Sequence, residues 1–334
     1  MDELTRVREL YGEPKPDPVL KARVGALLEA EARRRLRRPW TAAVAGLAAA
    51  VATAAVIALP GGSPGVPGAT PTLEPAGRSI LLAAAVTAES GTVQAGAYWR
   101  VRKLVRQRYP EMLGEGGSRY WMVDRRISEQ WVSRNGNVWA GAVSLGAEPA
   151  GPADREAWLQ EGSPAEWPGH QVFTAPGPST LAVVRGGVAF SMAGRPMTFA
   201  QIRSLPVDPV ALRAHVAEIV SADEGVVADA LSGLLWSKPS PPDVRAAAYR
   251  ALADLPNVTY LGTQTDESGR AGAAFSFTLR EPSGLVRRTL IIDTGSSQVI
   301  SSTTDAAGVK NDRVELVLEA GWTNERPSAP HPPG

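Results

Sequence analysis

One long apolar segment, residues 40–59, dominates the pattern of hydrophobic and polar positions along the chain. No charged residue occurs between Arg38 and Glu74. A helix rises about 1.5 Å per residue, so this segment would be about 30 Å long, which is the thickness of the hydrocarbon core of a bilayer. The pattern predicts a transmembrane helix at residues 40–60.

The charges that flank this segment predict its orientation. Only the N-terminal flank is rich in arginine, at Arg33, Arg34, Arg35, Arg37 and Arg38. By the positive-inside rule, residues 1–39 form a cytoplasmic arm, and the C-terminal part is extracytoplasmic. A cleaved signal peptide is one alternative, although the region before the apolar segment is long for one. A buried helix of a soluble protein is another, although such a helix normally has a polar stripe.

Two further segments flank the predicted span. In the cytoplasmic arm, apolar residues between Val19 and Leu28 have helical spacing, with Asp17 as the expected N-cap and Pro18 at the first helical position. Residues 61–75 are rich in Gly, Pro and Ser and contain too few large apolar residues for a core. We therefore predict a cytoplasmic helix on one side of the membrane and a linker on the other.

Beyond the linker, the pattern predicts a helix at residues 78–89 and then an antiparallel meander. The predicted strands, 97–107, 119–132 and 138–143, are rich in aromatic and β-branched residues. Asn135 and Gly136 are typical of a tight hairpin turn. Alternation places four arginines on one face of this sheet: Arg100, Arg102, Arg106 and Arg125. Four tryptophans are expected to fill the core or its rim: Trp99, Trp121, Trp131 and Trp139.

The rest of the chain predicts helices followed by strands. The expected helices are 154–160, 198–204, 210–220, 226–236 and 243–252, and the expected strands are 258–264, 273–280, 286–292, 298–302 and 314–320. Asp208 is the expected N-cap of the third helix. The predicted fold is an extracytoplasmic α+β domain, residues 76–323, with a curved antiparallel β-sheet packed on several helices. Residues 324–334 are rich in proline, which predicts a disordered tail.

Composition restricts the possible chemistry. The formal net charge is +1, which gives no reason to expect a nucleic-acid partner. The absence of cysteine excludes disulfides, thiolate metal sites and lipid anchoring through cysteine. The three histidines are too dispersed for a metal site: His170, His215 and His331. We therefore assign no catalytic, cofactor-binding or metal-binding residue, and we expect no enzyme activity and no cofactor.

One short motif does suggest catalysis. Residues 291–297, Ile-Ile-Asp-Thr-Gly-Ser-Ser, resemble the active-site loop of aspartic peptidases, in which two aspartates share a proton. The chain has one Asp-Thr-Gly, so a catalytic pair would require Asp293 from both subunits of a dimer. The alternative is a β-hairpin in which the Asp293 side chain caps the turn and Gly295 has a positive φ. We favour the hairpin.

The whole chain resembles a family of actinobacterial single-pass membrane proteins. The resemblance rests on the alanine-rich span, Arg-Ser-Ile-Leu-Leu-Ala-Ala-Ala at 78–85, Leu-Pro-Val-Asp-Pro-Val-Ala-Leu at 205–212 and the motif at 291–297. It implies a membrane location and no known catalytic residues. The order of helix, meander, helices and meander also resembles the lipoprotein-carrier and envelope-sensor class typified by LolA and RseB. That resemblance implies a site for an acyl chain or peptide between the sheet and the helices.

These patterns together predict a membrane-anchored extracytoplasmic binding or sensing protein of the plasma membrane. Its expected partners are the lipid bilayer and a lipid or envelope-protein ligand. An aspartic-peptidase-like enzyme that uses Asp293 in a dimer is one alternative. A transmembrane regulator of an extracytoplasmic sigma factor is another, although the zinc-binding anti-sigma domain is missing. A binding module predicts an apolar cavity between sheet and helices, whereas the peptidase predicts two Asp293 side chains meeting at a dimer axis.

Overall fold

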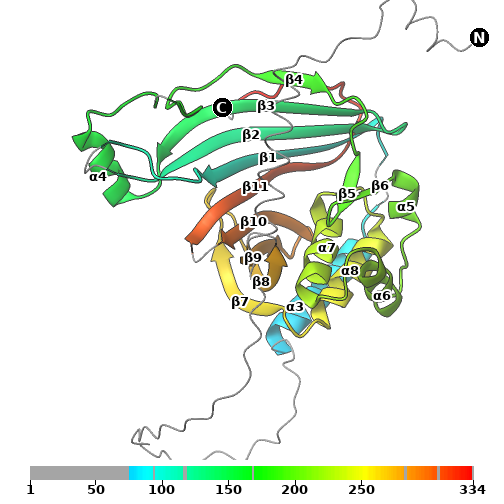
Figure 1. The fold of residues 1–334 in the computed structure, drawn as a ribbon. Helices are drawn as coiled ribbons and strands as arrows, with labels where there is room; N and C mark the ends of the chain where they lie inside the picture. Colours follow the sequence, from blue (N-terminus) through cyan, green and yellow to red (C-terminus); the bar gives the residue numbers. More distant parts are fainter. Residues whose placement is uncertain are drawn as a thin grey trace, which may run out of the picture. The chain divides into compact units, whose positions relative to one another are not determined.

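A large antiparallel sheet and six helices make up the described part of the chain, so the fold is α+β, as the sequence predicted (Figure 1). The computed structural model describes residues 75–92, 95–115, 119–167, 169–281, 284–306 and 309–332. The predicted transmembrane helix, cytoplasmic arm and linker lie outside these residues. Within the described ranges, no helix has the length and apolar character needed to cross a membrane.

The order of the strands shows how two meanders form one sheet. The strands lie in the order β4-β3-β2-β1-β11-β10-β9-β8-β7. Strands β1 and β11 pair antiparallel in the middle, from Tyr98 opposite Thr323 to Gln107 opposite Arg313. The strand bounds are β1 (Tyr98–Arg108), β2 (Met122–Ser133), β3 (Val138–Pro149), β4 (Thr180–Val183), β7 (Thr259–Thr265), β8 (Ala271–Glu281), β9 (Gly284–Asp293), β10 (Gln298–Ala306) and β11 (Val309–Thr323).

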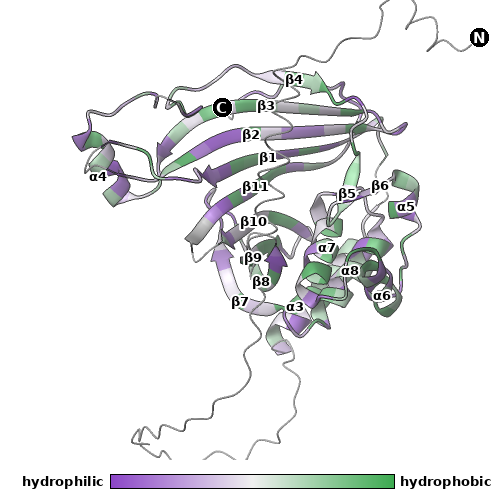
Figure 2. Cartoon of the chain, viewed as in Figure 1, coloured by the Kyte–Doolittle hydropathy of each residue, from purple (hydrophilic) through white to green (hydrophobic). Residues whose placement is uncertain are grey.

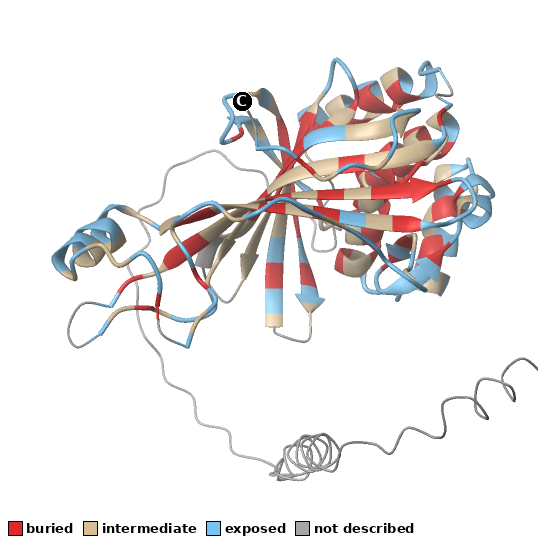
Figure 3. Cartoon of the chain, turned by 90° about the horizontal axis from the view of Figure 1, so that it is seen from above, coloured by how far each residue is buried: buried red, intermediate tan, exposed pale blue. Residues whose placement is uncertain are grey.

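Five of the six described helices cover one face of the sheet, here called the helix face, and the sixth, residues 152–160, lies apart from them at the far end of the first meander (Figure 1). Val101 of β1 and both Phe275 and Phe277 of β8 pack into one apolar core with Leu231 of α7. Buried residues concentrate where strands meet helices, and hydrophobic and hydrophilic residues both occur along the long strands (Figures 2 and 3). The helices are α3 (Pro75–Glu89), α4 (Pro152–Gln160), α5 (Phe199–Arg203), α6 (Pro209–Ile219), α7 (Glu224–Trp236) and α8 (Pro242–Ala253). The expectation that helices cover one face is confirmed.

The opposite face, here called the outer face, carries the predicted arginines. Arg100, Arg102 and Arg106 alternate along β1, and Arg125 of β2 lies opposite Arg106. Trp131 lies opposite Arg100 and is fully buried. The other three tryptophans of the first meander are half-buried, namely Trp99, Trp121 and Trp139. Both expectations for this meander are therefore confirmed.

Aspartate side chains cap the N-termini of α6 and α7. The Asp208 side chain accepts a hydrogen bond from the Ala211 amide (2.8 Å), which confirms the predicted cap of α6. Asp223 accepts hydrogen bonds from the amides of Gly225 (2.9 Å) and Val226 (3.0 Å). Such a cap satisfies amides that have no partner within the helix, and this stabilises the first turn. Helix α7 therefore begins at Glu224, two residues before the predicted start.

Strands β10 and β11 are longer than the predicted 298–302 and 314–320, and two further differences concern β3 and a small hairpin. Strand β3 continues beyond Val143 to Pro149, through a bulge at Leu145 that the sequence pattern did not reveal. A small hairpin, β5 (Phe190–Met192) and β6 (Arg195–Met197), was not predicted. Its turn residues Ala193 and Gly194 both have positive φ. Both differences arise at turns and bulges, where backbone conformation departs from the period-two pattern.

The proline-rich tail also differs from the prediction. Residues 324–332, predicted to be disordered, follow a defined path along the outer face, and Pro330 is buried. A proline-rich segment has little conformational entropy to lose, so a few contacts can hold it in place. Composition predicted a disordered tail and did not reveal the surface that receives it.

The close approach of α7 to β8 generates a stability prediction. A Cβ atom at Gly225 would lie 2.2 Å from the Thr278 carbonyl oxygen. We expect Gly225→Ala to lower the free energy of unfolding by about 1–3 kcal/mol, because an atom added to a packed core displaces its neighbours. Urea denaturation of the purified protein measures this change. The matched control is Gly295→Ala, at an exposed position where the nearest atom is 3.4 Å away. Equal stabilities of the two variants would contradict the prediction.

Candidate ligand-binding groove

The Asp-Thr-Gly motif lies in the turn between β9 and β10. Asp293 Oδ1 accepts a hydrogen bond from the Gly295 amide (3.0 Å), and Oδ2 accepts one from Ser296 Oγ (2.6 Å). Asp293 lies opposite Gln298 in the antiparallel pair of strands. The structure therefore confirms the hairpin, and both carboxylate oxygens cap their own turn.

The expected conformation of this turn was wrong in one respect. Ser297 has the positive φ (53°), and Gly295 does not. The Ser297 carbonyl oxygen accepts hydrogen bonds from Arg245 Nη2 (2.7 Å) and Tyr249 Oη (2.9 Å), both from α8. Burial raises the pKa of Tyr249, so its hydroxyl remains a donor. The left-handed residue of the turn is therefore Ser297, whose carbonyl oxygen contacts α8, and not Gly295, which local sequence preference had indicated.

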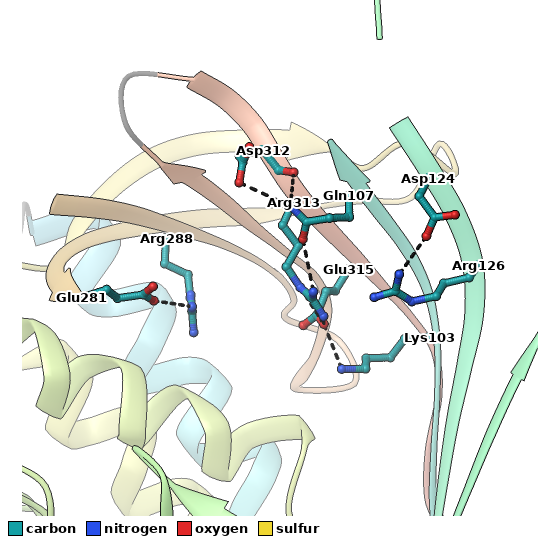
Figure 4. A network of polar contacts seen from close by, with 9 residues as sticks. All are labelled: Lys103, Gln107, Asp124, Arg126, Glu281, Arg288, Asp312, Arg313 and Glu315. Atoms are coloured by element: carbon teal, nitrogen blue, oxygen red, sulfur yellow. Dashed lines mark hydrogen bonds and ion pairs between the residues drawn. The ribbon is translucent and has the colours of Figure 1, made fainter. Parts of the chain in front are cut away.

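In the described part of the chain, a packed core lies between the sheet and the helices, and ion pairs lie beyond this core (Figure 4). Glu315 of β11 lies 3.0 Å from Lys103 Nζ and 2.6 Å from Arg313 Nη2. Burial opposes the ionisation of Glu315, but the two cations together hold its pKa below the usual value. Arg288 of β9 forms an ion pair with Asp229 of α7. This part of the helix face therefore carries charged side chains that form ion pairs with one another.

A buried lysine lies close to these ion pairs. Lys238, two residues after α7, is only 7% exposed, and its Nζ lies 3.4 Å from Ser237 Oγ. Burial lowers its pKa to about 8, although the Asp229 carboxylate partly offsets this effect. No sequence pattern predicted a functional or buried position for Lys238. The sequence feature that could have indicated its burial is its position between an apolar helix and Pro239.

A groove of about 700 Å³ lies at the end of the sheet formed by the β2–β3 turn. This volume is within the range of about 300–1,000 Å³ that is usual for small-molecule sites. Its walls come from that turn, from the segment before β5, from β6 and from α5. The lining residues are Arg134, Asn135, Gly136, Gly187, Val188, Ala189, Pro196, Met197, Thr198, Phe199, Ala200, Gln201 and Arg203.

Aromatic packing supports the apolar part of this groove. Phe199 stacks on Trp322 of β11, with ring centroids 5.3 Å apart, and meets Phe190 of β5 edge to face at 4.9 Å. Val188 is 49% exposed, so apolar surface remains accessible in the groove. Elements from the middle of the chain and its last strand therefore pack together at the apolar part of the groove.

Two arginines give the groove a positive charge. The guanidinium of Arg134 lies over the Trp322 ring, 4.7 Å from its centroid, and Arg134 Nε donates to the Gly96 carbonyl (2.8 Å). Arg203, in the last turn of α5, is exposed. The described lining contains no aspartate and no glutamate. The arrangement suits an apolar ligand that carries a negative charge.

The three histidines are not brought together. His170 contacts the Tyr109 hydroxyl (3.3 Å) and lies 3.4 Å from Glu111, whereas His215 lies in α6 and His331 in the tail. Among the residues that the structure describes, no group of three potential ligands could hold a metal ion.

The chain matches no protein-family model, no curated protein and no solved structure.

Lys238 generates a pH prediction. Its pKa is about 8 in the folded chain and about 10.4 in an unfolded chain, so at intermediate pH the unfolded chain binds the additional proton. Stability should therefore rise by about 2 kcal/mol between pH 7.5 and 9.5. Lys238→Met should remove most of this rise and stabilise the protein at pH 7.5. Urea denaturation across this range measures both effects, and parallel pH profiles for the two proteins would contradict the prediction.

Proposed function

We propose that this chain is a single-pass membrane protein whose extracytoplasmic domain binds an amphiphilic ligand with an acidic group. The ligand lies in the groove beside α5. The main support for this proposal is the composition of the groove. Its described lining combines an accessible apolar wall with two arginines and contains no acidic residue. The protein acts by binding or sensing and does not catalyse a reaction.

The sequence supports the membrane part of this proposal. The apolar segment 40–59 forms the span, and the arginines before it hold residues 1–39 in the cytoplasm. The linker at 61–75 then joins the span to the α+β domain. A binding domain attached in this way remains close to the outer surface of the plasma membrane, where amphiphiles are available.

The balance of interactions favours a lipid-like ligand. Each methylene group that leaves water for the apolar wall contributes about 0.8 kcal/mol. The arginines then select for a negative head group, because a neutral or cationic ligand leaves their charge without a partner. Figure 1 shows a curved sheet, and the groove lies at the end of this sheet that the β2–β3 turn forms.

No observation favours the peptidase alternative. Both carboxylate oxygens of Asp293 accept hydrogen bonds within their own turn. We therefore do not propose catalysis at this position.

Charge reversal at Arg203 tests the proposal. We expect Arg203→Glu to weaken the binding of a fluorescent fatty acid about tenfold or more, which corresponds to about 1.4 kcal/mol. Fluorescence titration of the purified protein measures this affinity. The matched control is Arg195→Glu, at an exposed position in β6 outside the groove, which should bind as the natural chain does.

A second ligand separates the contribution of the negative charge from that of the acyl chain. Lysophosphatidylcholine has an acyl chain but no net charge, so its weaker binding should respond little to Arg203→Glu. Absence of fatty-acid binding by the natural chain would overturn the proposal. Equal losses in the Arg203→Glu and Arg195→Glu variants would show that the groove is not the site.

A further inference from the structure

The C-terminal tail crosses the outer face of the first meander. The Asn324 side chain accepts a hydrogen bond from the Ala97 amide (3.0 Å), and Glu325 lies 3.1 Å from Arg100 of β1. Further along the tail, the His331 carbonyl accepts a hydrogen bond from Arg102 Nη2 (2.5 Å). The tail therefore leaves β11 and passes over β1 and β2 toward β3, and Figure 1 shows the C-terminal end beside β3.

The surface beneath the tail is shaped to receive a proline. Gly141 of β3 lies under Pro330, and a Cβ atom at position 141 would come within 2.8 Å of Pro330 Cδ. The Ser179 hydroxyl donates to the Pro330 carbonyl oxygen. Pro330 is the most buried residue of the tail. Glycine at position 141 thus leaves the space that the proline ring fills.

Aromatic rings and a guanidinium form the adjoining surface. Tyr98 contacts both Trp131 and Trp139 edge to face, with centroid distances of 6.2 Å and 5.8 Å. The Arg100 guanidinium lies over Trp131, 4.5 Å from the ring centroid. Flat aromatic surfaces with a nearby hydrogen-bond donor are the chemistry that recognises polyproline II segments. We call this region, with Arg102 and Gly141, the tail surface.

Most of the contacts to the distal part of the tail do not depend on its side chains. The acceptors at residues 330 and 331 are main-chain carbonyl oxygens, which every extended peptide presents. In addition, Glu129 Oε2 is buried and has no hydrogen-bond partner among the described residues. The prolines at 327, 330 and 332 cannot donate an N–H group. A different peptide with a free donor can therefore make contacts here that the tail does not make.

We propose that the tail surface is a binding site for an extended proline-containing peptide of a partner protein, and that the tail occupies it as an internal competitor. The partner must displace a segment attached at an effective concentration on the order of millimolar. The intact chain is thus held in a low-affinity state. This interaction is separate from ligand binding in the groove beside α5.

A shortened chain that lacks residues 324–334 and ends at Thr323 tests the proposal. The probe is a fluorescein-labelled peptide of residues 324–334, and fluorescence anisotropy reports its binding. We expect the shortened chain to bind the peptide at least tenfold more tightly than the intact chain, because the internal competitor has gone. Introducing Gly141→Val into the shortened chain should remove most of this binding. The matched control is Ala140→Val, at an exposed position on the opposite face of β3.

A second measurement keeps the test decisive if the shortened chain does not fold. The chain has no cysteine, so Ser328→Cys in the intact chain provides a single labelling site on an exposed tail residue. The attached fluorophore should be immobilised, and Gly141→Val should release it, whereas Ala140→Val should not. Equal peptide binding by folded shortened and intact chains would overturn the proposal. A label that remains equally mobile in all three proteins would also overturn it.

Discussion

The pairing of β1 with β11 is the constraint on which the rest of the structure depends. Tyr98 and Thr323 are neighbours in space although more than 200 residues separate them in the chain. Closing such a long loop costs entropy that only a long run of strand contacts can offset. The pairing converts two local meanders into one sheet, so that the first meander gains a core and the helices gain a continuous face.

Arg100 shows how much the central pairing organises. Its guanidinium forms ion pairs with Glu129 of β2, with Glu319 of β11 and with Glu325 of the tail. The Glu129 side chain is completely buried, and a buried carboxylate is tolerated only with a partner such as this one. One side chain of β1 therefore connects the neighbouring strands to the segment that covers the outer face.

The two faces of the sheet have different chemistry because different segments cover them. Helices and the β5–β6 hairpin cover the helix face, and the groove lies where this cover ends, beside Phe199 and Trp322. An extended tail covers part of the outer face by contacts to main-chain carbonyls. The last strand thus supports the groove wall, because Trp322 stacks on Phe199, while the C-terminal tail covers part of the outer face.

Local sequence determined a large part of the fold. Alternating residues predicted both meanders and the arginine face, and Asp208 predicted the start of α6, because these signals act within a few residues. Tertiary structure decided the pairing of the meanders, the left-handed Ser297, the burial of Lys238 and the position of the tail. The pairing of the meanders, the contact of Ser297 with α8 and the position of the tail each depend on a partner far away in the chain. The groove could not be predicted for the same reason, since Arg134, Phe199 and Trp322 meet only after the sheet has formed.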